Sequence, residues 1–182
     1  MKRSTRDLSW TYDRPLRRAI VVYDSPHGKT RRVAEALAEG IRSESVPTDV
    51  VPIDEALTRS FVPYDLIAVG SPNAWVSTSD GVRRLLKALA GLPAEGRYAF
   101  AFDLHTRGHL DGAASEIAHA FDHLKLRVPL PAKSGVVQRG PSRPGAGSEA
   151  AFQLREGTEG EFEGLGRSLV RTIRHELAEA FD

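Results

Sequence analysis

The 182-residue sequence predicts a three-layer α/β fold, in which a doubly wound parallel sheet of five strands lies between helices. Two observations predict it. Short apolar segments alternate five times with segments whose apolar residues recur at helical spacing. The apolar segments are nearly continuous rather than alternating, which is typical of parallel strands that are buried on both faces.

β-Branched and aromatic residues dominate the segments that we expect to be strands. These are residues 18–23, 48–53, 65–70, 97–103 and a fifth strand within 126–137. Pro129 and Pro131 obscure the beginning of the fifth strand because proline cannot donate to a sheet ladder, and 134–137 is its clearer half. Residues 138–147 are rich in glycine, proline and serine and are expected to form a loop.

The expected helices combine an apolar stripe with a residue that can cap the first turn. They begin at residue 30, after the caps Asp54 and Ser79, at residue 111 or 112, and after the cap Thr158. Ser79 and Asp54 are suited to accept hydrogen bonds from the first backbone N–H groups of their helices. Thr158 and Glu161 have the spacing of a capping box, so we expect Thr158 to cap the last helix.

Composition narrows the class of protein. The chain has no cysteine, which excludes disulfides, iron–sulfur clusters and thiolate chemistry. No apolar run approaches the roughly 20 residues that a membrane-spanning helix needs, so no integral membrane segment is predicted. The N-terminal region lacks the apolar core of a secretory signal, and we therefore expect a cytoplasmic protein.

Charge is unevenly distributed along the chain. The net charge of +1 argues against nucleic acid as a partner. Residues 1–18 hold six of the 25 Lys and Arg residues and two of the 24 acids, which leaves 19 against 22, or −3, for the remainder. We therefore expect a basic N-terminal extension at 1–17 and a folded domain at 18–182.

The first expected strand runs directly into a short polar loop that opens a helix. Free N–H groups and the helix dipole make a helix N-terminus a natural anion site. Hydroxyl groups on either side of a glycine would add donors, and the glycine lets backbone approach a ligand closely. The sequence therefore predicts a phosphate site made by Ser25, Pro26, His27, Gly28, Lys29 and Thr30.

Two other interpretations of this loop compete with a monophosphate site. The run Gly28-Lys29-Thr30 matches the end of a nucleotide P-loop, but that motif needs a glycine where Tyr23 stands. Asp103, which follows an apolar strand, would suit a magnesium-binding aspartate, yet the first loop is too short to wrap two phosphates. A strand–helix turn that binds no ligand stays open as an alternative.

Three segments resemble the flavodoxin-like family. Ser25-x-x-Gly28-x-Thr30 after an apolar strand resembles the family's FMN phosphate loop. Residues 65–75 resemble its third strand and the loop that flanks the isoalloxazine ring, and residues 102–108 stand where the second ring-contacting loop is expected. The resemblance covers about residues 18–180 and implies the strand order 2-1-3-4-5, with one FMN bound noncovalently.

The resemblance also implies which residues contact the ring. They are Ser71, Pro72, Asn73, Ala74, Trp75 and Val76 from one loop, and Asp103, Leu104, His105, Thr106, Arg107 and Gly108 from the other. The Trp75 ring would stack on the flavin, although packing on the next helix is an alternative. His105 or His109 would donate to a reduced flavin or a quinone oxygen, and Arg107 would offset the charge of a reduced flavin.

Some residues depart from the family pattern. Members usually carry Asn where Lys29 stands and a small polar residue where His27 stands, and the second ring loop lacks the Tyr common in electron carriers. A charge of −3 is also weak for steering onto basic partners. We therefore expect electron transfer or an FMN-dependent oxidoreductase, with a redox protein or a small acceptor such as a quinone. A flavin-free scaffold of the same fold is the alternative.

Two histidine pairs have a spacing that can hold a metal ion. They are His105 with His109 and His119 with His123. No acidic motif accompanies either pair, and His119 and His123 are expected on the solvated side of their helix. The sequence therefore predicts no metal site.

Overall fold

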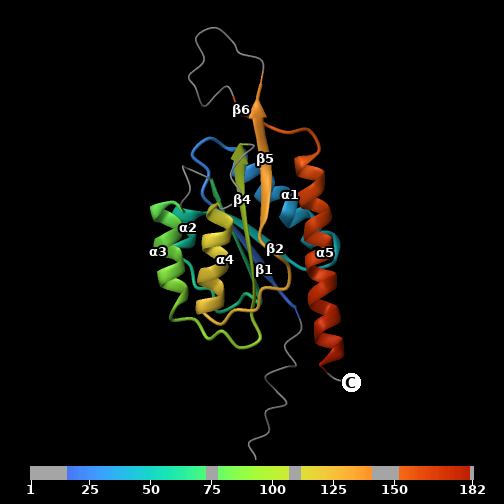
Figure 1. Ribbon diagram of the computed structural model, residues 1–182. Helices are drawn as coiled ribbons and strands as arrows, with labels where there is room; N and C mark the ends of the chain where they lie inside the picture. The colour runs from blue at the N-terminus through green and yellow to red at the C-terminus, as the bar shows by residue number, and fades with distance from the viewer. Residues whose placement is uncertain (1–15, 73–77, 107–111, 141–151, 181–182) are drawn as a thin grey trace, which may run out of the picture.

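A computed structural model describes residues 16–72, 78–106, 112–140 and 152–180 (Figure 1). The sheet has six strands in the order β2-β1-β3-β4-β5-β6, and every pairing is parallel except that of β5 with β6. The expected α/β class and the order 2-1-3-4-5 are confirmed, while the expected count of five strands is corrected to six. Most of the expected N-terminal extension, residues 1–15, lies outside the described residues.

Strands and helices alternate along the chain until the final hairpin. The strands are β1 Ala19–Tyr23, β2 Thr48–Pro52, β3 Leu66–Pro72, β4 Tyr98–Thr106, β5 Lys133–Arg139 and β6 Phe152–Leu154. The helices are α1 Lys29–Ser43, α2 Ile53–Ala56, α3 Asp80–Leu89, α4 Ala113–His123 and α5 Thr158–Glu179. None of the helices in the described ranges is long and apolar enough to cross a membrane.

The sixth strand was not expected from the sequence. It is only three residues long and pairs antiparallel with the end of β5, where Val137 faces Leu154 and Arg139 faces Phe152. Residues 138 and 139, expected in a loop, therefore belong to β5. So short a strand has no detectable periodicity, and its pairing with β5 is what defines it.

Two strands extend farther than their apolar patterns indicate. The expected end of β4 at residue 103 is wrong, because β5 provides partners up to the pair Thr106–Val137. Similarly, β3 continues through Ser71 and Pro72, which pair with Asp103 and Leu104 of β4. Six residues expected in ring-contacting loops thus lie in strands.

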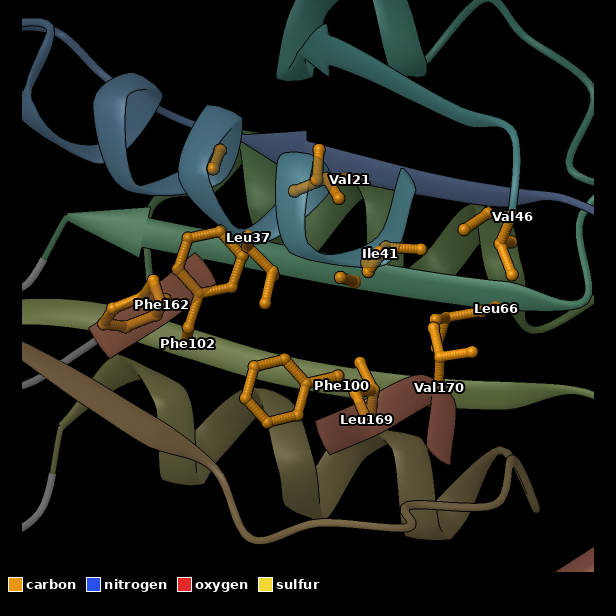
Figure 2. Close-up of a cluster of buried hydrophobic side chains, with 14 of the residues drawn as sticks. Val21, Leu37, Ile41, Val46, Leu66, Phe100, Phe102, Phe162, Leu169 and Val170 are labelled. Atoms are coloured by element: carbon orange, nitrogen blue, oxygen red, sulfur yellow. The ribbon is translucent and has the colours of Figure 1, made fainter. Parts of the chain in front are cut away.

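The helices cover both faces of the sheet. Helices α1 and α5 cover one face, and α2, α3 and α4 cover the other (Figure 1). The rings of Phe100, Phe102 and Phe162 fill the core beneath α1 and α5 (Figure 2). The ring centroids of Phe102 and Phe162 are 5.8 Å apart at an interplanar angle of 64°, an edge-to-face arrangement that aromatic pairs favour.

Helices α1 and α5 pack closely because glycine stands where they meet. A Cβ on Gly40 would lie 2.0 Å from the carbonyl oxygen of Glu163, and a Cβ on Gly166 would lie 2.3 Å from that of Leu37. Neither position has room for a side chain, so backbone rests directly on backbone. This contact fixes α1, whose N-terminus is the expected phosphate site.

One of the three helix caps expected from the sequence is confirmed. The Ser79 side chain accepts from Val82 N–H at 3.3 Å and caps α3 as expected. The caps expected at Asp54 and Thr158 are wrong, since α2 follows Pro52 and α5 follows Gly157. Gly157 occupies the left-handed region at φ 86°, which moves Thr158 inside the helix.

A side chain occupies part of the outer edge of β2. The N–H of Ala19 donates to Pro47 O at 2.9 Å, so the next carbonyl along β2, that of Thr48, points away from β1. The Arg42 guanidinium donates to this oxygen through Nη2 at 2.7 Å and Nε at 3.2 Å. This edge carbonyl therefore has a partner within the chain.

We predict that Gly166→Ala lowers the free energy of unfolding by about 1–3 kcal/mol, because the added methyl group would force α1 and α5 apart. Gly160→Ala is the matched control, since a Cβ there meets nothing within 4 Å. The control should leave stability unchanged or raise it by up to about 1 kcal/mol. Urea denaturation measures both, and equal effects would show that the glycine contact does not limit the packing.

Candidate functional site

Three expected site segments emerge at one edge of the sheet. They follow β1, β3 and β4, which are neighbours, and the parallel register places Tyr23 beside Gly70 and Gly70 beside Phe102. The carboxyl ends of parallel strands are where ligands bind in open α/β sheets. Some expected site residues lie outside the described residues, namely Asn73, Ala74, Trp75, Val76, Arg107, Gly108 and His109.

The segment after β1 forms a tight turn into α1. The N–H of Asp24 donates to Gly70 O at 3.0 Å, and that of Gly28 donates to Ser25 O at 3.4 Å. Gly28 is the residue that precedes the helix and has φ 77°, a conformation that side-chain-bearing residues rarely adopt. The glycine expected from the sequence is thus required by the turn itself.

The Ser25 hydroxyl has a structural partner that the sequence did not predict. Its Oγ accepts from the backbone N–H of Arg31 at 3.1 Å. This N–H belongs to the first turn of α1 and has no partner within the helix. The hydroxyl still carries its own proton, so Ser25 can hold the turn and donate to an anion at the same time.

The N-terminus of α1 differs in charge from those of the other helices. Of the five helices in the described part of the chain, α1 alone has no acidic residue in its first turn. It begins instead with Lys29, Arg31 and Arg32. The positive end of the helix dipole therefore adds to these side chains, an arrangement that favours a bound anion.

Two of these cations pair with nearby acids. The Arg31 Nε lies 2.8 Å from Glu35 Oε1, and this hydrogen bond raises the pKa of Arg31. The Arg32 guanidinium meets the carboxylate of Glu159 in α5 with two hydrogen bonds, at 2.7 and 3.0 Å. The pair of Arg31 with Glu35 lies along α1, whereas the pair of Arg32 with Glu159 joins α1 to α5.

The predicted phosphate-site residues differ in exposure. Pro26 and His27 are exposed, and Lys29 is half-buried. Thr30, in the first turn of α1, is only 2% exposed. The structure brings these residues together, with Thr30 as the most buried member.

Two buried polar residues pair in register within β3 and β4. Ser71 and Asp103 are fully buried and adjacent in register. The Ser71 hydroxyl donates to Pro72 O at 3.1 Å. The Asp103 Oδ2 accepts from Ala114 N–H at 2.9 Å, while its Oδ1 has no hydrogen-bond partner in the part of the chain that the structure describes. Leu104, next along β4, packs in the core on the other face.

Glu116 in α4 contacts Thr78, which comes two positions after the first ring-contacting segment. Its carboxylate accepts from Thr78 N–H at 2.8 Å and from Thr78 Oγ1 at 2.9 Å. Sequence reasoning missed this pair, because the two residues are 38 positions apart and no local motif signals their contact.

The histidines of α4 lie as the sequence predicts. Both His119 and His123 are exposed, while Ile117 and Phe121 on the same helix are buried. Over the described ranges, no group of three or more His, Asp or Glu side chains is arranged to hold a metal ion.

Comparisons with known proteins identify relatives over part of the chain. No protein-family model matches. A coenzyme F420H2 oxidase of Methanothermobacter marburgensis is 35% identical over 79 residues, which is 41% of this chain and 20% of that protein. A flavodoxin of Aquifex aeolicus is 33% identical over 75 residues, 41% of this chain and 40% of that protein. The chain thus matches at most two fifths of the length of these two curated relatives.

Solved structures establish the fold. An archaeal flavodoxin superposes with a TM-score of 0.64 at 21% identity, over 87% of this chain and 99% of that one. The flavodiiron protein of Giardia intestinalis gives 0.68 at 20% identity, over 95% of this chain and 40% of that one. The chain has the flavodoxin-like fold, and the resemblance predicted from the sequence is confirmed at that level.

We predict that Ser25→Ala destabilises the ligand-free protein by about 0.5–2 kcal/mol, because the Arg31 N–H loses its cap. Ser168→Ala is the control, since that hydroxyl bonds Gly164 O inside an exposed helical turn. The control should change the free energy of unfolding by less than about 0.5 kcal/mol. Urea denaturation of both variants without ligand is the measurement. A Ser25 variant as stable as the control would contradict the capping role.

Proposed function

We propose that this chain binds FMN noncovalently and acts in flavin-linked electron transfer or as an FMN-dependent oxidoreductase. The observation that carries the proposal is the N-terminus of α1, which lacks acidic residues, begins with cations and lies at the carboxyl edge of the sheet. The flavodoxin-like fold supports it, as do the relatives described as a flavodoxin and as an oxidase.

The phosphate of FMN would be held by the turn between β1 and α1. The first-turn N–H groups and the Ser25 O–H would donate to its oxygens, and the conformation of Gly28 keeps the backbone open to them. Lys29 would add positive charge beside the dianion. Because Thr30 is buried, its hydroxyl would act inside the turn, where a charge-assisted hydrogen bond is shielded from water.

The ring would lie against residues 71–76 and 103–108, which begin within β3 and β4 and continue beyond them. Ser71 and Asp103 are buried and paired in register within these strands, which supports a rigid base for both segments. Stacking by Trp75, hydrogen bonding by His105 and charge compensation by Arg107 remain proposals. Bound FMN would supply one- or two-electron chemistry, while the chain binds and orients it.

The electron acceptor or donor is proposed by class. The coenzyme F420H2 oxidase is a redox protein by its description, which supports a redox protein or a small acceptor such as a quinone as the partner here. The match spans only a fifth of that protein, so it supports the class of partner and not the relative's own reaction.

A flavin-free scaffold is the second candidate. The observations that favour it are the burial of Thr30 and the engagement of Ser25 Oγ with the backbone, because a turn that is already satisfied needs no ligand.

An FMN titration separates the two candidates. We expect the purified protein to retain the visible absorbance of flavin after desalting, or the ligand-free protein to quench FMN fluorescence to a stoichiometric end point. A colourless protein that leaves FMN fluorescence unchanged would support the scaffold instead.

We predict that Thr30→Val weakens FMN binding by about 1–3 kcal/mol, through loss of a hydrogen bond to the phosphate. Thr58→Val is the matched control, because its exposed hydroxyl bonds only Glu55 O, in the turn after α2. The dissociation constant from fluorescence quenching measures both. Equal affinity of the Thr30 variant and the wild type would contradict the assignment of the phosphate loop.

A further inference from the structure

We propose that the first turn of α4 is the common anchor of the two ring-contacting segments, with Glu116 and Asp103 as positioning residues. The inference rests on the proposed FMN site and deepens it. It assigns a role to two carboxylates that come from outside the phosphate loop and do not need to touch the cofactor.

The first link joins β4 to α4. The N-cap of α4, Gly112, offers no side chain to the N–H groups of the first turn. The buried Asp103 carboxylate takes this role from the neighbouring strand and accepts from Ala114 N–H at 2.9 Å. The residue at the beginning of the second ring-contacting segment is therefore bonded to the helix that follows that segment.

The second link joins the same turn of α4 to Thr78, two positions after the first ring-contacting segment. Both Glu116 oxygens are used on Thr78, one for its N–H and one for its hydroxyl. Thr78 is 2% exposed and directly precedes Ser79, the N-cap of α3. Arg83 of α3 approaches the same carboxylate at 3.9 Å. Glu116 thus holds Thr78 in place, directly before α3 begins.

The two links lie on the face opposite the phosphate loop. Helix α4 packs on the sheet face shared with α2 and α3, whereas α1 packs on the other face with α5. Loss of the Glu116 contacts should therefore change how the ring is held and leave the phosphate contribution intact. This separation makes the inference testable independently of the phosphate loop.

The test compares FMN with riboflavin, which has the same ring and no phosphate. Glu116→Ala should weaken the binding of both by the same factor, about tenfold or more, so that the ratio of the two affinities stays at the wild-type value. The visible circular dichroism of the bound flavin should also change. Glu116→Gln can accept from one of the two Thr78 donors and should give an intermediate loss.

Two controls accompany the test. Asp122→Ala removes an exposed carboxylate from the same helix and should bind both ligands like the wild type. Urea denaturation of each ligand-free variant reports folding. If Glu116→Ala does not fold, Thr78→Val replaces it, because this variant keeps the backbone N–H and loses only the hydroxyl bond to Glu116.

Three outcomes would overturn the inference. A folded Glu116→Ala variant with wild-type affinity for both ligands and an unchanged dichroism spectrum would show that the anchor does not position the ring. A loss confined to FMN would place the effect at the phosphate instead. A wild-type protein that binds neither ligand would refute the proposed function itself, and the inference with it.

Discussion

The parallel pairing of β1 with β2 on one side and β3 on the other is the constraint on which the molecule depends. It brings the ends of β1, β3 and β4 to one edge of the sheet, so that α1 must begin where the other two strands end. The turn at Gly28 then aims the N-terminus of the helix outward. Without that pairing, the cations of the turn and the buried carboxylate of Asp103 would not lie toward the same edge of the sheet.

The two faces of the sheet stabilise different parts of this edge. On one face, the glycine contact between α1 and α5 holds α1 and the turn before it in place, and the pair of Arg32 with Glu159 joins the first turns of both helices. On the other face, the carboxylate of Asp103 in β4 accepts a hydrogen bond from Ala114 of α4, and the carboxylate of Glu116 in α4 accepts from Thr78. A ligand at this edge that contacted both the turn before α1 and the residues near α4 would bind two parts of the chain that are held in place by separate contacts.

Most of the fold could be predicted because its signals are local. Apolar strands, helical periodicity and the Ser79 cap all depend on neighbouring residues. The errors arose where tertiary context decides. Pairing with β5 extends β4 beyond the apolar run, and the left-handed Gly157 displaces Thr158 from the cap. For the candidate site, the tight turn with glycine at position 28 was predictable from its residue types. The contact of Glu116 with Thr78 joins distant segments and leaves no trace in sequence spacing.

The hydrogen bonds of the Arg42 guanidinium to Thr48 O, on the unpaired edge of β2, also bear on association between copies of the chain. An extended segment from another molecule could lengthen the sheet only by hydrogen bonding to that row of backbone groups. It would first have to displace a charged side chain, and it would find no donor at Pro52, where the strand ends. This margin of the sheet is thus protected against fibrillar self-association.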